Sequence, residues 1–427
     1  MSTETNNKIV TWIESLLFCL VLILPARCFN GFFLSLFQTN SNINVQYINL
    51  VDLAIILVTI SFIIGKNKLF LDKTFFKLIL FYIGSNVFMS LLLVFTGHGD
   101  FIGELISKSV IVLCAGVIVT KLDKYTETQK CAIYIIPLSI LVIASFFLSG
   151  YGAYATMNRV GSLGFGTNET ANFACIILAI ALFVTNINIW LRVASVLISL
   201  ACVLNVASRR GMLVAIAIVV IWFLLLLWNN RSSKIASRAF WGAIITIVGC
   251  IVVLIIKHEQ ILNYVNNSAL MIRYRIAARY NNEFIDISDR ISIYDEIFEY
   301  LNNHFVFGSY GCDKLLAQGH IAHSHNLLLQ FIATYGVLIG PIYALFSIIT
   351  FVRSLILLKH YFKVKENVFS AIISIFYTLY FVFEMFGYLL WNPKGLLWIV
   401  ITMFFIRFEY RKLKNSSDKT GNRLNYD

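Results

Sequence analysis

The side chains best suited to chemistry in this sequence are arginines and histidines. Arg209 and Arg210 in SRRG and His323 and His325 in HSHN stand at the edges of apolar runs, and Arg290 lies in a long hydrophilic segment. Guanidinium groups bind phosphate oxygens, and an imidazole whose pKa lies near neutrality can act as a general base. The pattern favours general-base chemistry beside a bound phosphate group at a membrane surface.

Each of these groups also has a purely structural interpretation. An arginine at a helix end can extend its head group to the membrane surface, and a histidine there is often only a hydrogen-bonded structural residue. An arginine at the rim of a membrane is nevertheless a functional candidate by default. The candidate catalytic residues are Arg209, Arg290 and His325, and the candidate substrate-binding residues beside them are Arg210, His323 and Asn326. The sequence leaves open which of Arg209 and Arg210, and which of His323 and His325, is catalytic.

The composition predicts an all-α polytopic membrane protein. Of the 427 residues, 59% are hydrophobic and 13% charged, too apolar for a soluble core. The net charge of +12 is spread over short loops and does not form one basic face, so we expect no nucleic-acid partner. Runs long enough to span a bilayer, about twelve in number, lie at 9–28, 47–65, 74–96, 101–120, 131–149, 169–186, 188–206, 210–228, 239–256, 326–352, 367–390 and 395–408.

The loop charges predict the orientation of these runs. The main groups of Lys and Arg fall on one side if both termini are cytoplasmic. The external, periplasmic side then receives the loop 150–168, the turn 207–211 and one long loop. The predicted organisation is nine transmembrane helices in 1–256, a large periplasmic loop in 257–325, three more helices in 326–408 and a cytoplasmic tail in 409–427.

The long loop is rich in ionisable residues and is expected to contain short helices. It holds five of the seven histidines, eight acidic residues and six Lys or Arg. A helix over 262–280 would place Arg275 and Arg279 one turn apart, as further substrate-binding candidates. A second begins at Ser288 and Asp289, runs to about Asn303, and carries Arg290 on an extension of its apolar stripe. The stripe is Tyr294, Ile297, Phe298 and Leu301. Arg290 at the positive end of this helix would favour a phosphate.

A glycine-rich stretch, RVGSLGFGTNETAN at 159–172, precedes the sixth run. It is either a flexible external loop, with Asn168 or Thr170 capping the next helix, or a weak phosphate-binding loop. It lacks the lysine of a P-loop and the GxGxxG order. Because the stretch could still bind phosphate weakly, Arg159 at its start is a further substrate-binding candidate.

Other polar features have structural interpretations. Glu104 and Lys108 lie one turn apart and can neutralise each other, although charges within apolar runs are also what a transporter needs. The HxH pair lacks a third ligand at a recognisable spacing, and no CxxC occurs, so we expect neither a metal nor another cofactor. Four prolines in the chain indicate long uninterrupted helices.

Three places in the chain resemble the O-antigen polymerase and ligase family. They are Gly164–Asn172 before an apolar run, SRRG at 208–211, and the segment from Arg290 through HFVFGSYG to HSHNLLLQFIATYGVLIG. The resemblance implies a metal-independent, inverting glycosyltransferase that uses undecaprenyl-diphosphate-linked glycans at the outer face of the bacterial inner membrane. Arg209 or Arg210 and Arg290 would hold the diphosphate, and His325 would act near the acceptor. A chain-length regulator and a flippase are the protein partners this implies.

The apolar residues after His-Asn favour a polymerase that joins lipid-linked repeat units. A ligase that transfers the polysaccharide to lipid A-core is the alternative within the family. A polysaccharide or lipid transporter is the alternative from another class, and it predicts inverted repeats and broken helices.

Overall fold

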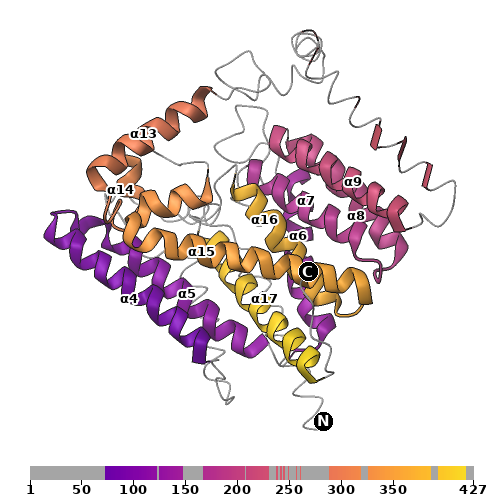
Figure 1. Cartoon of the computed structure of the whole chain (residues 1–427), viewed down its shortest axis with the longest axis horizontal. Helices are drawn as coiled ribbons and strands as arrows, with labels where there is room; N and C mark the ends of the chain where they lie inside the picture. The colour runs from indigo at the N-terminus through magenta and orange to yellow at the C-terminus, as the bar shows by residue number, and fades with distance from the viewer. Residues whose placement is uncertain are drawn as a thin grey trace. The chain divides into compact units, whose positions relative to one another are not determined.

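The computed structural model describes residues 73–122, 125–147, 167–206, 208–229, 288–318, 326–385 and 393–419, with a few isolated positions between 237 and 260. All regular elements within these ranges are helices (Figure 1). They are α4 (Lys73–Phe95), the short η1 (Gly99–Phe101), α5 (Ile102–Leu122), α6 (Glu127–Phe147), α7 (Thr167–Phe183), α8 (Ile189–Val206), α9 (Arg209–Asn229), α13 (Ser288–His304), α14 (Asp313–Gln318), α15 (Leu327–Val364), α16 (Val368–Glu384) and α17 (Pro393–Lys419).

Each predicted apolar run that falls within the described residues corresponds to one of these helices. Six of them are long and apolar enough to cross a membrane, namely α4, the η1–α5 stretch, α6, α8, α9 and α15. Two shorter apolar helices, α7 and α16, lie among them. The runs at 9–28 and 47–65, and most of 239–256, lie outside the described residues.

Two helices continue beyond the apolar runs that predicted them. α15 extends to Val364, where Lys365 in a left-handed conformation ends it, and α17 extends to Lys419, into the predicted tail. The added turns are rich in Lys and Arg, which are good helix formers. The end of an apolar run therefore marks a change from apolar to more polar sequence, while the helix itself continues.

The chain forms two compact units, which are described separately. One consists of residues 1–137 and 289–427, and the other of residues 138–288. Within the first unit, α5 contacts α4 and α17, while α15 contacts α16 and α17. Within the second unit, α7 contacts both α8 and α9. α6 belongs to the first unit up to Pro137 and to the second from Leu138.

The expectation of uninterrupted helices is wrong for α15, which breaks at Gly336. The backbone there has φ 67° and ψ 179°, outside the helical region. A residue with a side chain rarely adopts this φ. A Cβ atom at Gly336 would also lie 2.1 Å from the Val306 carbonyl oxygen. Only glycine fits this position, so the break is built into the sequence.

The turn that follows α13 forms hydrogen bonds with backbone groups that the break leaves without helical partners. Phe305 and Val306 accept hydrogen bonds from the N–H groups of Val337 and Leu338, at 3.0 and 3.4 Å. These bonds join the turn to the residues that follow Gly336.

The same turn also reaches the residues before the break. The N–H groups of Ser309 and Gly311 donate to the carbonyls of Ala333 and Thr334, at 3.0 and 2.7 Å. Irregular backbone within a membrane segment is tolerated only where protein or enclosed water satisfies it. The segment 305–311 satisfies the backbone groups at the break in this apolar helix.

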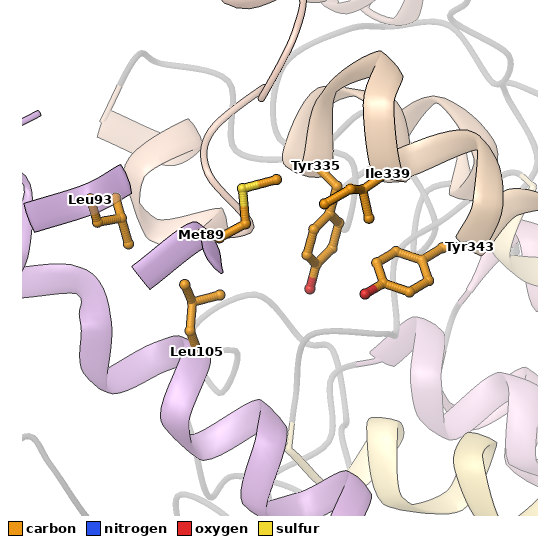
Figure 2. Close-up of a cluster of buried hydrophobic side chains, with 6 residues drawn as sticks. All are labelled: Met89, Leu93, Leu105, Tyr335, Ile339 and Tyr343. Carbon is orange, nitrogen blue, oxygen red and sulfur yellow. The ribbon is translucent and has the colours of Figure 1, made fainter. Parts of the chain in front are cut away.

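The parts of α15 before and after the break approach each other closely at Gly340. A Cβ atom at Gly340 would lie 2.5 Å from the Phe331 carbonyl oxygen. Figure 2 shows the buried side chains in this region, Met89 and Leu93 of α4, Leu105 of α5, and Tyr335, Ile339 and Tyr343 of α15. The rings of Tyr335 and Tyr343 pack edge to face with centroids 4.8 Å apart, a favourable arrangement for aromatic pairs. The break is thus packed against α4 and α5.

We expect Gly336→Ala to destabilise the protein by at least about 1–3 kcal/mol, the usual strain of an unfavourable backbone conformation, because the new methyl group also collides with Val306. The matched control is Gly84→Ala in α4, where a Cβ atom meets nothing within 4 Å and alanine favours helix. Thermal unfolding of both variants in detergent measures the difference. Equal unfolding temperatures would contradict the account of the break.

Candidate functional site

α13 and α14 share a buried cluster with the part of α15 that precedes its break. Ile297 and Leu301 form a buried cluster with Ala333 and with Leu316 of α14, and Leu329 and Ile332 pack against it. The end of α13 lies near the break, because Phe305 and Val306 bond to Val337 and Leu338.

The order of these contacts indicates the relative direction of the two helices. The residues just after α13 bond to the residues just after the break, and the buried cluster contains earlier residues of both helices, Ile297 and Leu301 of α13 and Ala333 of α15. The helices therefore run in the same direction, as Figure 1 shows. Arg290 is seven residues before Ile297, and Asn326 is seven before Ala333, roughly 10 Å along each helix. The N-termini of α13 and α15 lie at the same end of the pair.

The predicted helix from Ser288 to about Asn303 is confirmed as α13, but its buried stripe is partly wrong. Phe298 is exposed, whereas Ile293 and Tyr300 pack against the buried cluster. α13 has seven apolar or aromatic residues, so its sequence is compatible with more than one buried stripe. The cluster shared with α14 and α15 determines which stripe is buried. The position of Arg290, three residues before Ile293, continues the stripe that is buried. Its backbone lies in the first turn of α13, and its side chain is outside the described part of the chain.

Asn326 is the N-cap of α15. Its side-chain oxygen accepts hydrogen bonds from the N–H groups of Leu328 and Leu329, at 3.0 and 3.1 Å, which are groups that a helix start leaves unsatisfied. This gives Asn326 a structural task, beside the substrate-binding role predicted for it. His323 and His325 lie outside the described residues, but His325 directly precedes this cap in the sequence.

A buried group of charges fastens the segment 311–313 to α5. Lys108 donates to Asp313 and to Glu104, both at 2.7 Å, and to the Gly311 carbonyl at 3.0 Å. Glu104 in turn accepts from the Asp313 N–H at 2.9 Å and from the Cys312 thiol. The predicted Glu104–Lys108 pair is confirmed, and Asp313 is the partner that the sequence did not indicate.

Asp313 also ties this charge group to α15. Its second oxygen accepts from Gln330 and Thr334, each at 3.1 Å. Burial raises the pKa of the Asp313 carboxyl to about 7, an effect that the neighbouring Glu104 carboxylate adds to and Lys108 opposes. Burial also raises the pKa of Cys312 to about 12, so its thiol is not activated as a nucleophile. These residues hold α5, the segment 311–313 and α15 together.

In the second unit, the start of α9 lies against the start of α7. Ser208 caps α9, since its hydroxyl accepts from the Gly211 N–H at 3.2 Å and donates to the Asn168 side chain at 2.9 Å. A Cβ atom at Gly211 would lie 2.5 Å from the Ala171 Cβ. The Cys175 thiol donates to the Gly211 carbonyl at 3.3 Å. The start of α7, which ends the stretch 159–172, thus contacts SRRG, although the two are far apart in the sequence.

The arginines of SRRG occupy the first turn of α9. Arg209 is its first residue, with its side chain outside the described part of the chain, and Arg210 is half-buried. Neither Asn168 nor Thr170 caps the next helix as expected, because α7 already begins at Thr167 and Asn168 instead bonds Ser208. The other substrate-binding candidates, Arg159, Arg275 and Arg279, lie outside the described residues.

These features define a polytopic helical membrane protein with basic residues at the starts of several helices. Residues 194–344 match the family model described as O-Antigen ligase, which is about a third of the 427-residue chain. The match confirms the resemblance for this part of the chain. A search of curated proteins found no match.

We expect Lys108→Met to destabilise the protein by about 3–5 kcal/mol, because it leaves two buried carboxylates without their cation. Asp313→Asn is the matched control, since it keeps the Lys108–Glu104 pair and should lose only about 1–2 kcal/mol of hydrogen bonding. Chemical or thermal unfolding of the purified variants gives both values. If Asp313→Asn were as destabilising as Lys108→Met, the charge group would not have the role assigned to it.

Proposed function

We propose that this protein is a polysaccharide polymerase that joins undecaprenyl-diphosphate-linked repeat units by inverting, metal-independent glycosyl transfer. The observation that carries the proposal is the family match over residues 194–344, which contains all three candidate catalytic residues, Arg209, Arg290 and His325. Arg210, His323, Asn326, Arg275 and Arg279 also lie within it, whereas Arg159 does not.

The packing of α13 on α15 supports the assignment of Arg290 and His325 to one site. Arg290 is in the first turn of α13, and His325 immediately precedes the cap of α15. Both helix starts lie at the same end of the pair, and each contributes a partial positive charge. An anion held at this end would be stabilised by the Arg290 guanidinium and by the helix starts together.

The proposed chemistry needs only groups of this kind. A hydroxyl of the acceptor sugar attacks the anomeric carbon of the donor, and the bond from that carbon to the diphosphate oxygen breaks. His325 takes the hydroxyl proton, and undecaprenyl diphosphate leaves with the bonding electron pair. Arg290 and Arg209 or Arg210 stabilise the charge that develops on the diphosphate.

Ligase activity is the second candidate, and the description of the matching family model favours it. A ligase would use the same donor but transfer the glycan to lipid A-core. A transporter is less well supported, although the break in α15 is a feature that transporters share. The carbonyls of Ala333 and Thr334 at this break accept hydrogen bonds from Ser309 and Gly311, so they are already used within the protein.

The proposal also covers location and partners. We place the site on the periplasmic side of the inner membrane, with both termini in the cytoplasm, because the short loops rich in Lys and Arg would then be cytoplasmic. The bilayer supplies the lipid-linked substrate laterally. A flippase would deliver the repeat units, and a chain-length regulator would act on the growing polymer.

The polysaccharide of a deletion strain tests the proposal. We expect gel analysis of its lipopolysaccharide to show core plus a single repeat unit, because unpolymerised repeats still reach the ligase. Core without any repeat would identify a ligase instead, and an unchanged ladder would contradict both family functions. Reintroducing the gene should restore the ladder.

Arg290→Ala and His325→Ala should each abolish the polymer while the protein remains in the membrane, since they remove a diphosphate-binding cation and the base. Arg353→Ala and His304→Ala are matched controls. Arg353 lies over the Tyr410 ring, and His304 stacks on Tyr300 at the far end of α13. Both controls should give normal ladders in the same gel assay. Normal ladders from Arg290→Ala and His325→Ala would overturn the assignment of these residues.

A further inference from the structure

A carboxamide without any hydrogen-bond partner lies where the starts of α7 and α9 meet. Asn172 of α7 is 1% exposed, and neither its side-chain oxygen nor its nitrogen is hydrogen-bonded within the part of the chain that the structure describes. An amide buried in this way destabilises a protein, because it has lost its hydrogen bonds to water and gained none in return. Orphaned buried polar groups are rare in native proteins, and each calls for an explanation such as a ligand.

The neighbours of Asn172 on α7 show which way this part of the helix faces. Asn168, Ala171, Asn172 and Cys175 fall within an arc of about 100° on a helix of 3.6 residues per turn. Asn168 bonds Ser208, Ala171 is in close approach to Gly211, and Cys175 bonds the Gly211 carbonyl. Asn172 therefore belongs to the side of α7 that faces the first turn of α9, where Arg210 lies.

The chemistry of the carboxamide narrows the kind of ligand. Its nitrogen donates two hydrogen bonds and its oxygen accepts them, so a partner must both donate and accept to satisfy it. A phosphate dianion accepts only, and would leave the Asn172 oxygen unsatisfied. A sugar hydroxyl or acetamido group has both functions.

We propose that Asn172 binds a hydroxyl or acetamido group of the lipid-linked glycan, as a specificity-determining residue beside the diphosphate. The inference rests on the proposed function, since it takes the substrate to be a lipid-linked sugar. It assigns the diphosphate to the arginines and the sugar to the amide. The two parts of the substrate are then recognised by different residues.

Binding to purified full-length protein in lipid nanodiscs separates these parts. The probes are undecaprenyl diphosphate alone and the undecaprenyl-diphosphate-linked repeat unit isolated from the deletion strain, and thermal shifts give their apparent affinities. Asn172→Leu should unfold at a higher temperature than the wild type without ligand, because it removes an orphaned amide. It should bind bare lipid normally but bind the repeat unit about tenfold more weakly, the usual effect of losing one hydrogen bond to a buried group.

The matched control is Ser199→Ala in α8, which removes another fully buried side-chain oxygen that has no hydrogen-bond partner. It should leave binding of both lipids unchanged. Asn172→Ala serves as a second variant if the leucine does not fold. If both Asn172 variants bind the repeat unit as the wild type does, the amide holds only water and the inference is overturned. A wild-type protein that responds to neither lipid would contradict the proposed function itself.

Discussion

The arrangement of the first unit depends on one constraint, that the backbone groups released by the break in α15 must be satisfied within the protein. At Gly336 the helical hydrogen-bond pattern stops, and the segment 305–311 supplies partners on both sides of the break. Unpaired backbone groups within a bilayer are destabilising by several kcal/mol each. The loop that follows α13 is therefore held against α15 at a fixed register.

This register has consequences for the residues proposed to do chemistry. Because the end of α13 is attached at the break, the direction of α13 along α15 is set, and its first turn lies at the same end as the α15 cap. Lys108 holds the following residues, Gly311 and Asp313, against α5. Two attachments thus hold residues 305–313, which follow α13, against α15 and α5.

The sequence predicted the local features well and the long-range ones poorly. The lengths of the apolar runs predicted the helices, and Ser288 and Asp289 predicted the start of α13. Both predictions depend only on residues that are neighbours in the sequence. The break at Gly336 was missed, since glycine is common in transmembrane helices and only the distant segment 305–311 makes the break possible. Asp313 was missed as a partner of Lys108 for the same reason, as 205 positions separate them. Of the proposed site, the sequence supplied the candidate residues, and only the fold could relate the starts of α13 and α15.

Glycosyl transfer between lipid-linked units is the central claim, and an assay with purified components tests it most directly. The full-length protein in nanodiscs is incubated with the undecaprenyl-diphosphate-linked repeat unit in the presence of a metal chelator. The account predicts glycans of several repeat units and a matching release of undecaprenyl diphosphate. Folded protein that binds the repeat unit but forms no longer glycan and releases no undecaprenyl diphosphate would contradict it.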